Sequence, residues 1–179
     1  LLIPMLAHGS EIRQTLSLLD HARVQLDNQG LVYRPVRLSA MIEIPAAALR
    51  AHQLVAEVDF ASLGTNDLAQ YALAADRQQG ELGALLDPWQ PALIDLVAAA
   101  CAGAEKVGRP IGVCGEAAAD PALAAVLVGL GVRSLSMAPV AVNDVRALLA
   151  DTDLETCKRA AAAVADAASA ADARQAVWS

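Results

Sequence analysis

Short apolar runs alternate along the chain with longer segments of mixed character, and this alternation predicts strands followed by helices. The runs expected to form strands are Leu1–Leu6, Val36–Ile44, Val58–Leu63, Pro110–Cys114 and Ser134–Met137. The intervening segments carry apolar residues at helical spacing or open with proline, which suits the first helical turn. Helices are expected over Ser10–Gly30, from Pro45 onward, and over Asp67–Asp76, Pro91–Val107, Pro121–Leu130 and Asn143–Leu149, with Ser10 and Asn143 as N-caps.

This order of elements predicts an α/β fold built on a parallel sheet. Strands that are apolar on both faces are typical of parallel sheets buried on both sides. Five strands in about 140 residues are too few for a closed eight-stranded barrel, which takes roughly 250 residues. Two arrangements therefore stay open from the residues alone. One is an open doubly wound sheet, and the other is more than half of a β/α barrel whose first strands lie upstream.

The Ala-rich tail, Asp153 to Trp178, is expected to form a separate helical unit. One face of that helix carries four residues at helical spacing: Leu154, Cys157, Ala161 and Val164. We therefore divide the chain into residues 1–150, the C-terminal part of the β/α unit, and 151–179, a helical tail that caps it or contacts a second subunit. A loosely attached helix that faces solvent is the alternative.

Composition and charge narrow the classes of function. The chain has 179 residues, enough for one domain with a core, and it is 56% hydrophobic with only 3% aromatic residues. Its formal net charge is −7, and no basic stripe is present to neutralise phosphates, which argues against binding nucleic acid. A small anionic ligand stays compatible with this charge where single arginines or a metal ion are placed locally.

The cysteines indicate a reducing compartment. Cys101, Cys114 and Cys157 are odd in number and lack metal-site spacing, so free thiols are expected. Cys101 and Cys157 fall on predicted helices and are interpreted as structural. No apolar stretch approaches the roughly 18 residues of a membrane span. The chain opens on Leu1 rather than Met, as an internal piece of a longer protein would, and we expect it to be cytoplasmic.

Polar groups stand where three predicted strands end. Glu43 lies at the end of the second strand, Asn66 and Asp67 follow the third, and Cys114 ends the fourth, pinched between two glycines. In a β/α barrel, polar groups at the carboxyl ends of successive strands converge on one site. The sequence therefore predicts an enzyme with its site at these strand ends.

Glu43 and Asp67 are candidate metal ligands. Glu43 lies in an apolar run, and a buried unpaired carboxylate is costly, so it needs a partner. A structural arginine or a helix N-terminus is the alternative to a metal ion. Gly64 permits a tight turn before Asp67, whose oxygen suits Mg²⁺, although an ordinary acidic residue in a first helical turn has the same sequence. Mg²⁺ usually takes one or two carboxylates plus substrate oxygens, which this pair would supply.

Arg77 and Cys114 are candidates for handling a substrate. An arginine after a polar loop is suited to clamping a phosphate with two hydrogen bonds, and an ion pair with Asp76 or Glu81 is the alternative. Flanking glycines let a ligand approach the backbone of Cys114 closely. Its thiol can act as an acid or a nucleophile, and a small buried hydrophobe is the alternative interpretation.

Taken in order, these segments resemble the family of enzyme I of the bacterial phosphotransferase system. The resemblance rests on Ile-Pro-Met, Glu-Ile-Pro-Ala-Ala-Ala, Gly-Val-Cys-Gly-Glu, Ser-Leu-Ser-Met and, most specifically, Val58–Arg77. It covers Leu1 to about Leu149. It implies a (β/α)₈ TIM barrel of the phosphoenolpyruvate/pyruvate type, of which this chain would supply about the last five β/α units.

The same resemblance implies phosphoenolpyruvate and Mg²⁺ as ligands. Glu43 and Asp67 would bind Mg²⁺. Asn66 and Arg77 would hold the phosphate, and Cys114 would protonate the enolate as pyruvate forms. These roles agree with the chemistry, because phosphoryl transfer needs positioning and charge neutralisation, and a thiol can supply a proton to carbon.

The activity implied for a whole enzyme I is phosphoryl transfer from phosphoenolpyruvate to a histidine in a separate N-terminal domain. The phosphoryl group then passes to the histidine phosphocarrier protein for sugar uptake, and a homodimer is implied as well. The chain lacks the family's earlier strands and any histidine in a Thr-Ser-His context, so it is expected to be inactive alone. The alternatives are the barrel domain of pyruvate phosphate dikinase or phosphoenolpyruvate synthase, and a non-catalytic dimerisation module.

Overall fold

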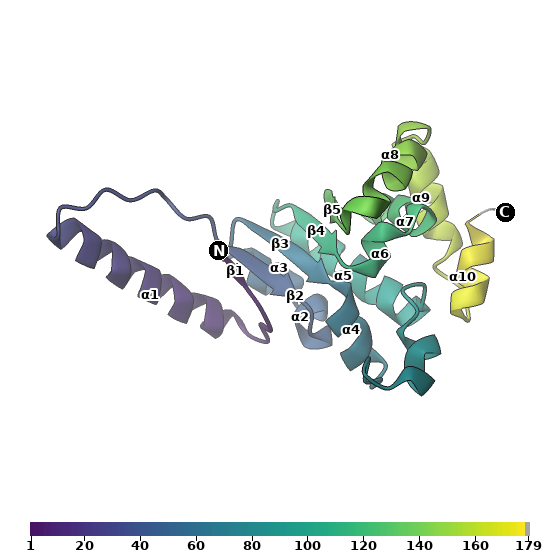
Figure 1. Ribbon diagram of the computed structural model, residues 1–179, viewed down its shortest axis with the longest axis horizontal. Coiled ribbons are helices and arrows are strands. Elements are labelled where there is room, and N and C mark those ends of the chain that lie inside the picture. The colour runs from purple at the N-terminus through teal and green to yellow at the C-terminus, as the bar shows by residue number, and fades with distance from the viewer. Residues whose placement is uncertain (178–179) are drawn as a thin grey trace.

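Five parallel strands form one sheet whose strand order follows the sequence. The computed structural model describes residues 1–177, apart from the side chain of Glu81. Its strands are β1 (Leu2–Ile3), β2 (Ser39–Ile42), β3 (Phe60–Gly64), β4 (Ile111–Cys114) and β5 (Ser134–Ser136). Their order in the sheet is β1-β2-β3-β4-β5 (Figure 1).

This sequential order decides between the two arrangements that the pattern left open. A doubly wound sheet reverses its strand order at a switch point, whereas a β/α barrel adds each new strand beside the previous one. Every neighbouring pair here is parallel and consecutive. The predicted α/β fold with a parallel sheet is confirmed, and its strand order is that of an arc of a barrel.

Helical segments connect the strands and complete the chain. They are α1 (Gly9–Asn28), α2 (Pro45–Leu49), α3 (Ala51–Val55), α4 (Thr65–Ala72), η1 (Gly80–Leu86), α5 (Pro91–Lys106), α6 (Glu116–Ala119), α7 (Pro121–Gly129), η2 (Pro139–Ala141), α8 (Val142–Ala150), α9 (Leu154–Ala163) and α10 (Ala170–Ala176), of which η1 and η2 are 3-10 turns. Proline opens α2, α5 and α7, where its fixed φ is helical and its missing N–H has no intrahelical partner anyway.

Two predicted helix caps are wrong. Helix α1 has His8 rather than Ser10 as its N-cap, because the Glu11 carboxylate accepts the backbone N–H of His8 at 2.9 Å. This bond, and a second one from the preceding residue, lower the pKa of Glu11 below its ordinary value. Helix α8 has Ala141 rather than Asn143 as its N-cap. The chain enters α8 from η2 already in a helical conformation, so no capping side chain is needed there.

The two faces of the sheet differ in chemistry. One face is apolar and belongs to the core: Ala40, Ile42, Ala61, Leu63, Ile111 and Val113. The other face carries small and polar residues in register, with Met41, Ser62, Gly112 and Ser134 in one row and Gly64, Cys114 and Ser136 in the next. Ser134 and Ser136 are exposed. The expected burial on both faces therefore holds for β2, β3 and β4, whose residues are all buried or half-buried, and it is wrong for β5.

Helix α1 stands apart from the other elements (Figure 1). Ile12 is its one fully buried residue, whereas Leu18 and Val24 are 71% and 56% exposed. Helix α1 has 20 residues but is not apolar enough to cross a membrane. No other helix within residues 1–177 is both long and apolar enough to do so. Apart from Ile12 and the adjoining Leu16 and Leu19 of α1, the core lies mainly between the sheet and the later helices.

Helix α9 packs the Ala-rich tail onto α7. Three of the four residues predicted to share a face are buried: Cys157, Ala161 and Val164. Leu154, the fourth, is half exposed. A Cβ atom on Gly129 of α7 would overlap the carbonyl oxygen of Cys157, so the two helices meet backbone to backbone. This contact excludes a loosely attached α9, and Trp178 of the predicted tail lies outside the described residues.

Candidate functional site

The carboxyl ends of β2, β3 and β4 gather three of the predicted site residues. Glu43 directly follows β2, Asn66 lies in the first turn of α4 after β3, and Cys114 ends β4. The strands are parallel neighbours, so these ends lie at one edge of the sheet. The Cys114 Sγ donates to the Leu63 carbonyl oxygen at 3.4 Å and lies 3.8 Å from the Met41 Sδ. The sequence-predicted thiol therefore sits inside the cluster of strand ends.

Glu43 is a buried carboxylate, 6% exposed, and it forms no ion pair within the described residues. Its Oε1 accepts the backbone N–H of Met5 at 2.6 Å. Its Oε2 lies 2.8 Å from the position that a Cβ on Gly64 would take. Met5 has a φ of 55°, a left-handed conformation that is unfavourable for its side chain. This strained turn aims a donor at Glu43, and neither an arginine nor a helix N-terminus is its partner.

Asp67 and Arg77 are paired with each other. The Arg77 Nη2 lies 2.8 Å from the Asp67 Oδ1. The alternative interpretation had Arg77 in an ion pair with Asp76 or Glu81. The structure pairs it with Asp67, because the chain turns back toward α4 at Ala74, whose φ is 50°. The side chain of Glu81 lies outside the described part of the chain. Arg77 is half exposed, and such pairs contribute only about 0–1 kcal/mol. Both side chains are thus available to stronger ligands.

Two cavities adjoin Asn66 and Glu116. One, of about 320 Å³, is also lined by Cys114. The other, of about 210 Å³, is also lined by Arg77 and Pro88. The thiol and the guanidinium therefore open onto adjoining spaces, with the Asn66 amide between them.

The turn after Cys114 depends on Gly115. Its φ of 115° and ψ of −168° fall in a region open essentially to glycine. A Cβ atom at Gly115 would lie 2.8 Å from the Thr65 Oγ1 and 2.9 Å from the Asn66 Oδ1. The Thr65 hydroxyl donates to the Cys114 carbonyl oxygen at 3.1 Å. This hydrogen bond and the close approach at Gly115 therefore fix the end of β4 against the first turn of α4.

Sequence reasoning did not single out three residues that shape this site. Thr65 and Glu116 had a signal, since they stand in the Gly-Thr-Asn-Asp and Gly-Val-Cys-Gly-Glu segments that carried the prediction. Met5 also stands in such a segment, Ile-Pro-Met, but it contributes a backbone N–H that its side chain does not reveal.

A metal site complete in protein ligands is not present within residues 1–177, where no group of three or more His, Cys, Asp and Glu residues could hold an ion. Mg²⁺ usually takes one or two carboxylates and completes its shell with substrate and water oxygens. Glu43, buried without a cation, fits that need as it stands. Asp67 fits it once Arg77 leaves. Both side chains thus have the chemistry of Mg²⁺ ligands, and their binding of a metal stays a prediction.

A larger cavity of about 810 Å³ lies at the opposite ends of the strands, before β4 and β5. Arg109, Arg133 and Lys158 line it together with the C-terminal ends of α5 and α7. Helix C-termini carry partial negative charge that basic residues offset. None of the predicted site residues lines this cavity, so its size does not make it the candidate site.

Thiol reactivity is expected to separate Cys114 from the other two cysteines. Cys101 is buried, and burial together with nearby Glu105 raises its pKa to about 12. Burial also raises the pKa of Cys157. The reactive form is the thiolate, so iodoacetamide at about pH 8 should label Cys114 alone while the protein is folded. Mass mapping of the labelled peptides measures this.

Cys114→Ser should remove the fast labelling and leave only slow reaction at the other thiols. Denaturant should make Cys101 and Cys157 react as ordinary cysteines. A first adduct on Cys101 would contradict the burial that sets its high pKa.

A protein-family model described as "PEP-utilising enzyme, PEP-binding domain" matches residues 1–154. Relatives named phosphoenolpyruvate-protein phosphotransferase include proteins of Streptomyces coelicolor (59% identical over 140 residues, 78% of this chain and 25% of the relative) and Cupriavidus necator (49% over 140 residues, 78% and 24%). Another, of Haloferax volcanii, is 40% identical over 152 residues, 85% of this chain and 27% of the relative. The chain thus spans about a quarter of the length of these relatives.

Among solved structures, a citrate lyase from Burkholderia xenovorans matches with a TM-score of 0.59. The match covers 99% of this chain and 60% of that chain at 17% sequence identity. A likeness at this level of identity concerns the fold alone. It agrees with the parallel α/β arrangement described above.

Proposed function

The chain belongs to the family of PEP-utilising enzymes, and from this membership we propose that it is the phosphoenolpyruvate-binding part of a phosphoenolpyruvate-protein phosphotransferase. The whole enzyme would move the phosphoryl group of phosphoenolpyruvate to a histidine in a separate N-terminal domain and release pyruvate. The histidine phosphocarrier protein would receive the group next, for sugar uptake. The identities of 59% and 49% to proteins of that name support this activity over a dikinase or synthase.

One observation carries the proposal: Glu43, Asn66 and Cys114 converge at the ends of three neighbouring parallel strands. Each brings a different chemistry, namely an anionic oxygen, an amide and a thiol. The amide can donate to the phosphate of a phosphorylated enol acid and the thiol can supply a proton to its carbon, whereas the Glu43 carboxylate can hold this anion only through a cation such as Mg²⁺.

The phosphate is assigned to Arg77 and Asn66. Arg77 now faces Asp67 across a half-exposed ion pair, which contributes little to stability. A phosphate offers Arg77 two charge-assisted hydrogen bonds in its preferred fork geometry. Substrate would therefore draw Arg77 away from Asp67 and free a carboxylate oxygen at the same moment.

That freed oxygen, with Glu43, makes the proposed Mg²⁺ site. When bound, Mg²⁺ would neutralise the charge that develops on the phosphoryl and enolate oxygens during transfer. The protein would contribute by fixing the positions of the carboxylates that bind the metal. The Met5 N–H fixes one Glu43 oxygen at 2.6 Å and leaves the other available.

The Cys114 thiol is assigned the proton that turns the enolate into pyruvate. Its S–H bond breaks as a C–H bond forms at the methylene carbon, and the thiolate left behind regains a proton from water in the adjoining cavity. In the free protein the thiol hydrogen is directed at the Leu63 carbonyl oxygen. The thiol must rotate from this position toward the substrate.

The proposed partners follow from the assignment to a whole phosphotransferase. They are the histidine phosphocarrier protein, reached through the N-terminal domain, and a second copy of the chain in a homodimer. Free cysteines at positions 101, 114 and 157 fit a reducing compartment such as the cytoplasm.

Calorimetric titration of phosphoenolpyruvate, with and without Mg²⁺, tests the proposed site through Glu43→Gln. We expect binding only with Mg²⁺ and an affinity reduced roughly 100-fold or more in the variant, because the amide replaces the one anionic ligand that has no cationic partner. The matched control is Glu155→Gln, an exposed acid paired with Lys158 on α9, which should bind like the parent.

Unchanged affinity in Glu43→Gln would contradict its metal role. A folded parent chain that does not bind phosphoenolpyruvate would contradict a working site in this chain. Pyruvate release that requires a nucleotide, measured on the longest natural protein containing this chain, would favour a dikinase or synthase instead.

A further inference from the structure

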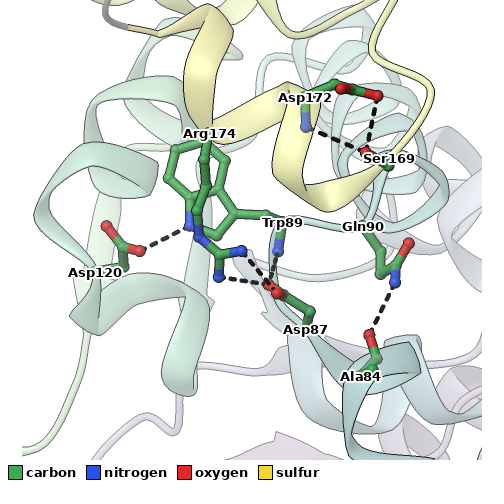
Figure 2. A network of polar contacts seen from close by, with 8 residues as sticks. All are labelled: Ala84, Asp87, Trp89, Gln90, Asp120, Ser169, Asp172 and Arg174. Atoms are coloured by element: carbon green, nitrogen blue, oxygen red, sulfur yellow. Dashed lines mark hydrogen bonds and ion pairs between the residues drawn. The ribbon is translucent and has the colours of Figure 1, made fainter.

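A network of polar contacts ties the C-terminal helix α10 to the segment that precedes α5 (Figure 2). Arg174 on α10 donates to both carboxylate oxygens of Asp87, at 2.7 and 2.8 Å. The same guanidinium lies over the Trp89 ring, 5.7 Å from its centroid. Asp87 also accepts the backbone N–H of Trp89 at 3.0 Å. One arginine therefore holds two neighbouring side chains of this segment.

Trp89 carries the network to the loop that follows Cys114. Its side chain is buried, 1% exposed, and its indole N–H donates to the Asp120 Oδ2 at 2.7 Å. The Asp120 Oδ1 accepts the backbone N–H groups of Ala122 and Leu123 and so caps α7. Asp120 is separated from Cys114 only by Gly115 and the short helix α6. The indole thus joins the segment before α5 to the loop after β4.

The segment Asp87–Trp89, which Arg174 holds, also lines the cavity that Arg77 lines. Pro88, between Asp87 and Trp89, and the preceding Leu86 contribute to its wall. The Gln90 side chain closes the segment by donating to the Ala84 carbonyl oxygen at 3.0 Å (Figure 2). The loop that begins at Arg77 is therefore held at its far end by the contacts of Arg174.

We propose that Arg174 is a positioning residue for the substrate site. It fixes the Asp87–Trp89 segment, and through it the loop that carries Arg77, relative to the loop after Cys114. It touches no substrate. The inference rests on the proposed function, since it assigns Arg77 to the phosphate. A loop ordered before binding loses less conformational entropy when the ligand arrives, and its affinity is higher for that reason.

Helix α10 lies beyond residue 154, where the family match ends. The contacts of Arg174 with Asp87 and Trp89 thus come from a part of the chain outside the matched domain. The tail therefore has two roles: α9 covers the core by packing on α7, and α10 positions the substrate site.

Arg174→Ala should weaken phosphoenolpyruvate binding in the presence of Mg²⁺ by about tenfold, because small displacements of a positioned group reduce binding and rate strongly. Amide hydrogen exchange should become faster in residues 77–90 and stay unchanged in β3 and β4. Arg174→Lys should restore part of the affinity, since it keeps the charge but loses the two-pronged contact. The matched control is Arg159→Ala on α9, which removes an exposed guanidinium that donates to the Thr156 hydroxyl and should leave both readouts unchanged.

A double-mutant cycle separates positioning from a general loss of stability. If Arg174 acts through Arg77, Arg174→Ala should change affinity less than about twofold in an Arg77→Ala background, because the group it positions is gone. In an Asn66→Ala background the tenfold loss should persist. A purely structural effect would instead lower affinity equally in both backgrounds.

Unchanged affinity and unchanged exchange in Arg174→Ala would overturn the proposal, as would an equal loss in the Arg77→Ala background. If the folded parent chain does not bind phosphoenolpyruvate, the proposed function fails by itself. Hydrogen exchange in Arg174→Ala then tests whether Arg174 holds the loop. Faster exchange confined to residues 77–90 supports this role, and unchanged exchange overturns it.

Discussion

Gly115→Ala should abolish phosphoenolpyruvate binding and lower the free energy of unfolding by about 2–4 kcal/mol. Two costs add at this position. An alanine must adopt a φ near 115°, where residues with a Cβ are strained. Its Cβ must also stand 2.8 Å from the Thr65 Oγ1 and 2.9 Å from the Asn66 Oδ1, closer than real contacts allow.

Relief of that overlap requires the Thr65 and Asn66 side chains to rotate away from Gly115, or the first turn of α4 to move away from β4. The Thr65 hydroxyl would lose its contact with the Cys114 carbonyl oxygen, and Asn66 would leave its place between the two cavities. Both the amide and the thiol are then displaced, so the predicted loss of binding exceeds what either group contributes alone. Urea denaturation and calorimetric titration measure the two effects.

Gly108→Ala is the matched control, since Gly108 has a φ of 64° but nothing within 4 Å of the place that an added methyl group would take. It should lose about 1 kcal/mol of stability for the left-handed conformation and bind substrate normally. Full binding by Gly115→Ala would show that this turn does not position Asn66.

Gly129→Ala is expected to detach the tail from the body of the protein. By helix propensity alone an alanine at this position, the last residue of α7, should gain about 1 kcal/mol. The structure reverses that sign, because the new Cβ would overlap the Cys157 carbonyl oxygen and stand 2.9 Å from the Lys158 backbone nitrogen. Backbone atoms of a helix cannot rotate aside, so α9 must separate from α7, and a loss of about 3 kcal/mol or more is expected.

Loss of the α7–α9 contact should uncover the apolar face of α9, including Cys157. Limited proteolysis should then cut near residues 151–153, before α9, and Cys157 should label in the folded variant. Gly80→Ala is the control, because a methyl there meets nothing within 4 Å. A Gly129→Ala protein more stable than the parent would mean that the two helices do not meet as described.

The local elements were largely predictable because local chemistry sets them. Proline at the start of α5 and α7, and apolar runs at β3 and β4, placed these elements within a few residues of their observed bounds. The caps of α1 and α8 were missed because other local interactions set these helix starts. At α1 the Glu11 side chain reaches back to His8, and at α8 a 3-10 turn leads directly into the helix.

The candidate site was predictable as a set of residues but not as a set of contacts. Glu43, Asn66 and Cys114 could be placed together because parallel strands end at one edge. Asp67, expected beside a metal, faces Arg77 instead, because the turn at Ala74 brings the chain back along α4. The roles assigned to both residues stay proposals.

By itself, the sequence determined the alternation of strands and helices, the chemistry at the strand ends and the absence of a basic stripe. Only the tertiary structure decided that the strands follow one another in order, that Met5 is the donor to Glu43, and that Arg174 reaches Asp87. The physical reason is distance along the chain. Periodicity and capping act over a few residues, whereas these contacts join residues 38 and 87 positions apart and form only after the strands and helices have packed.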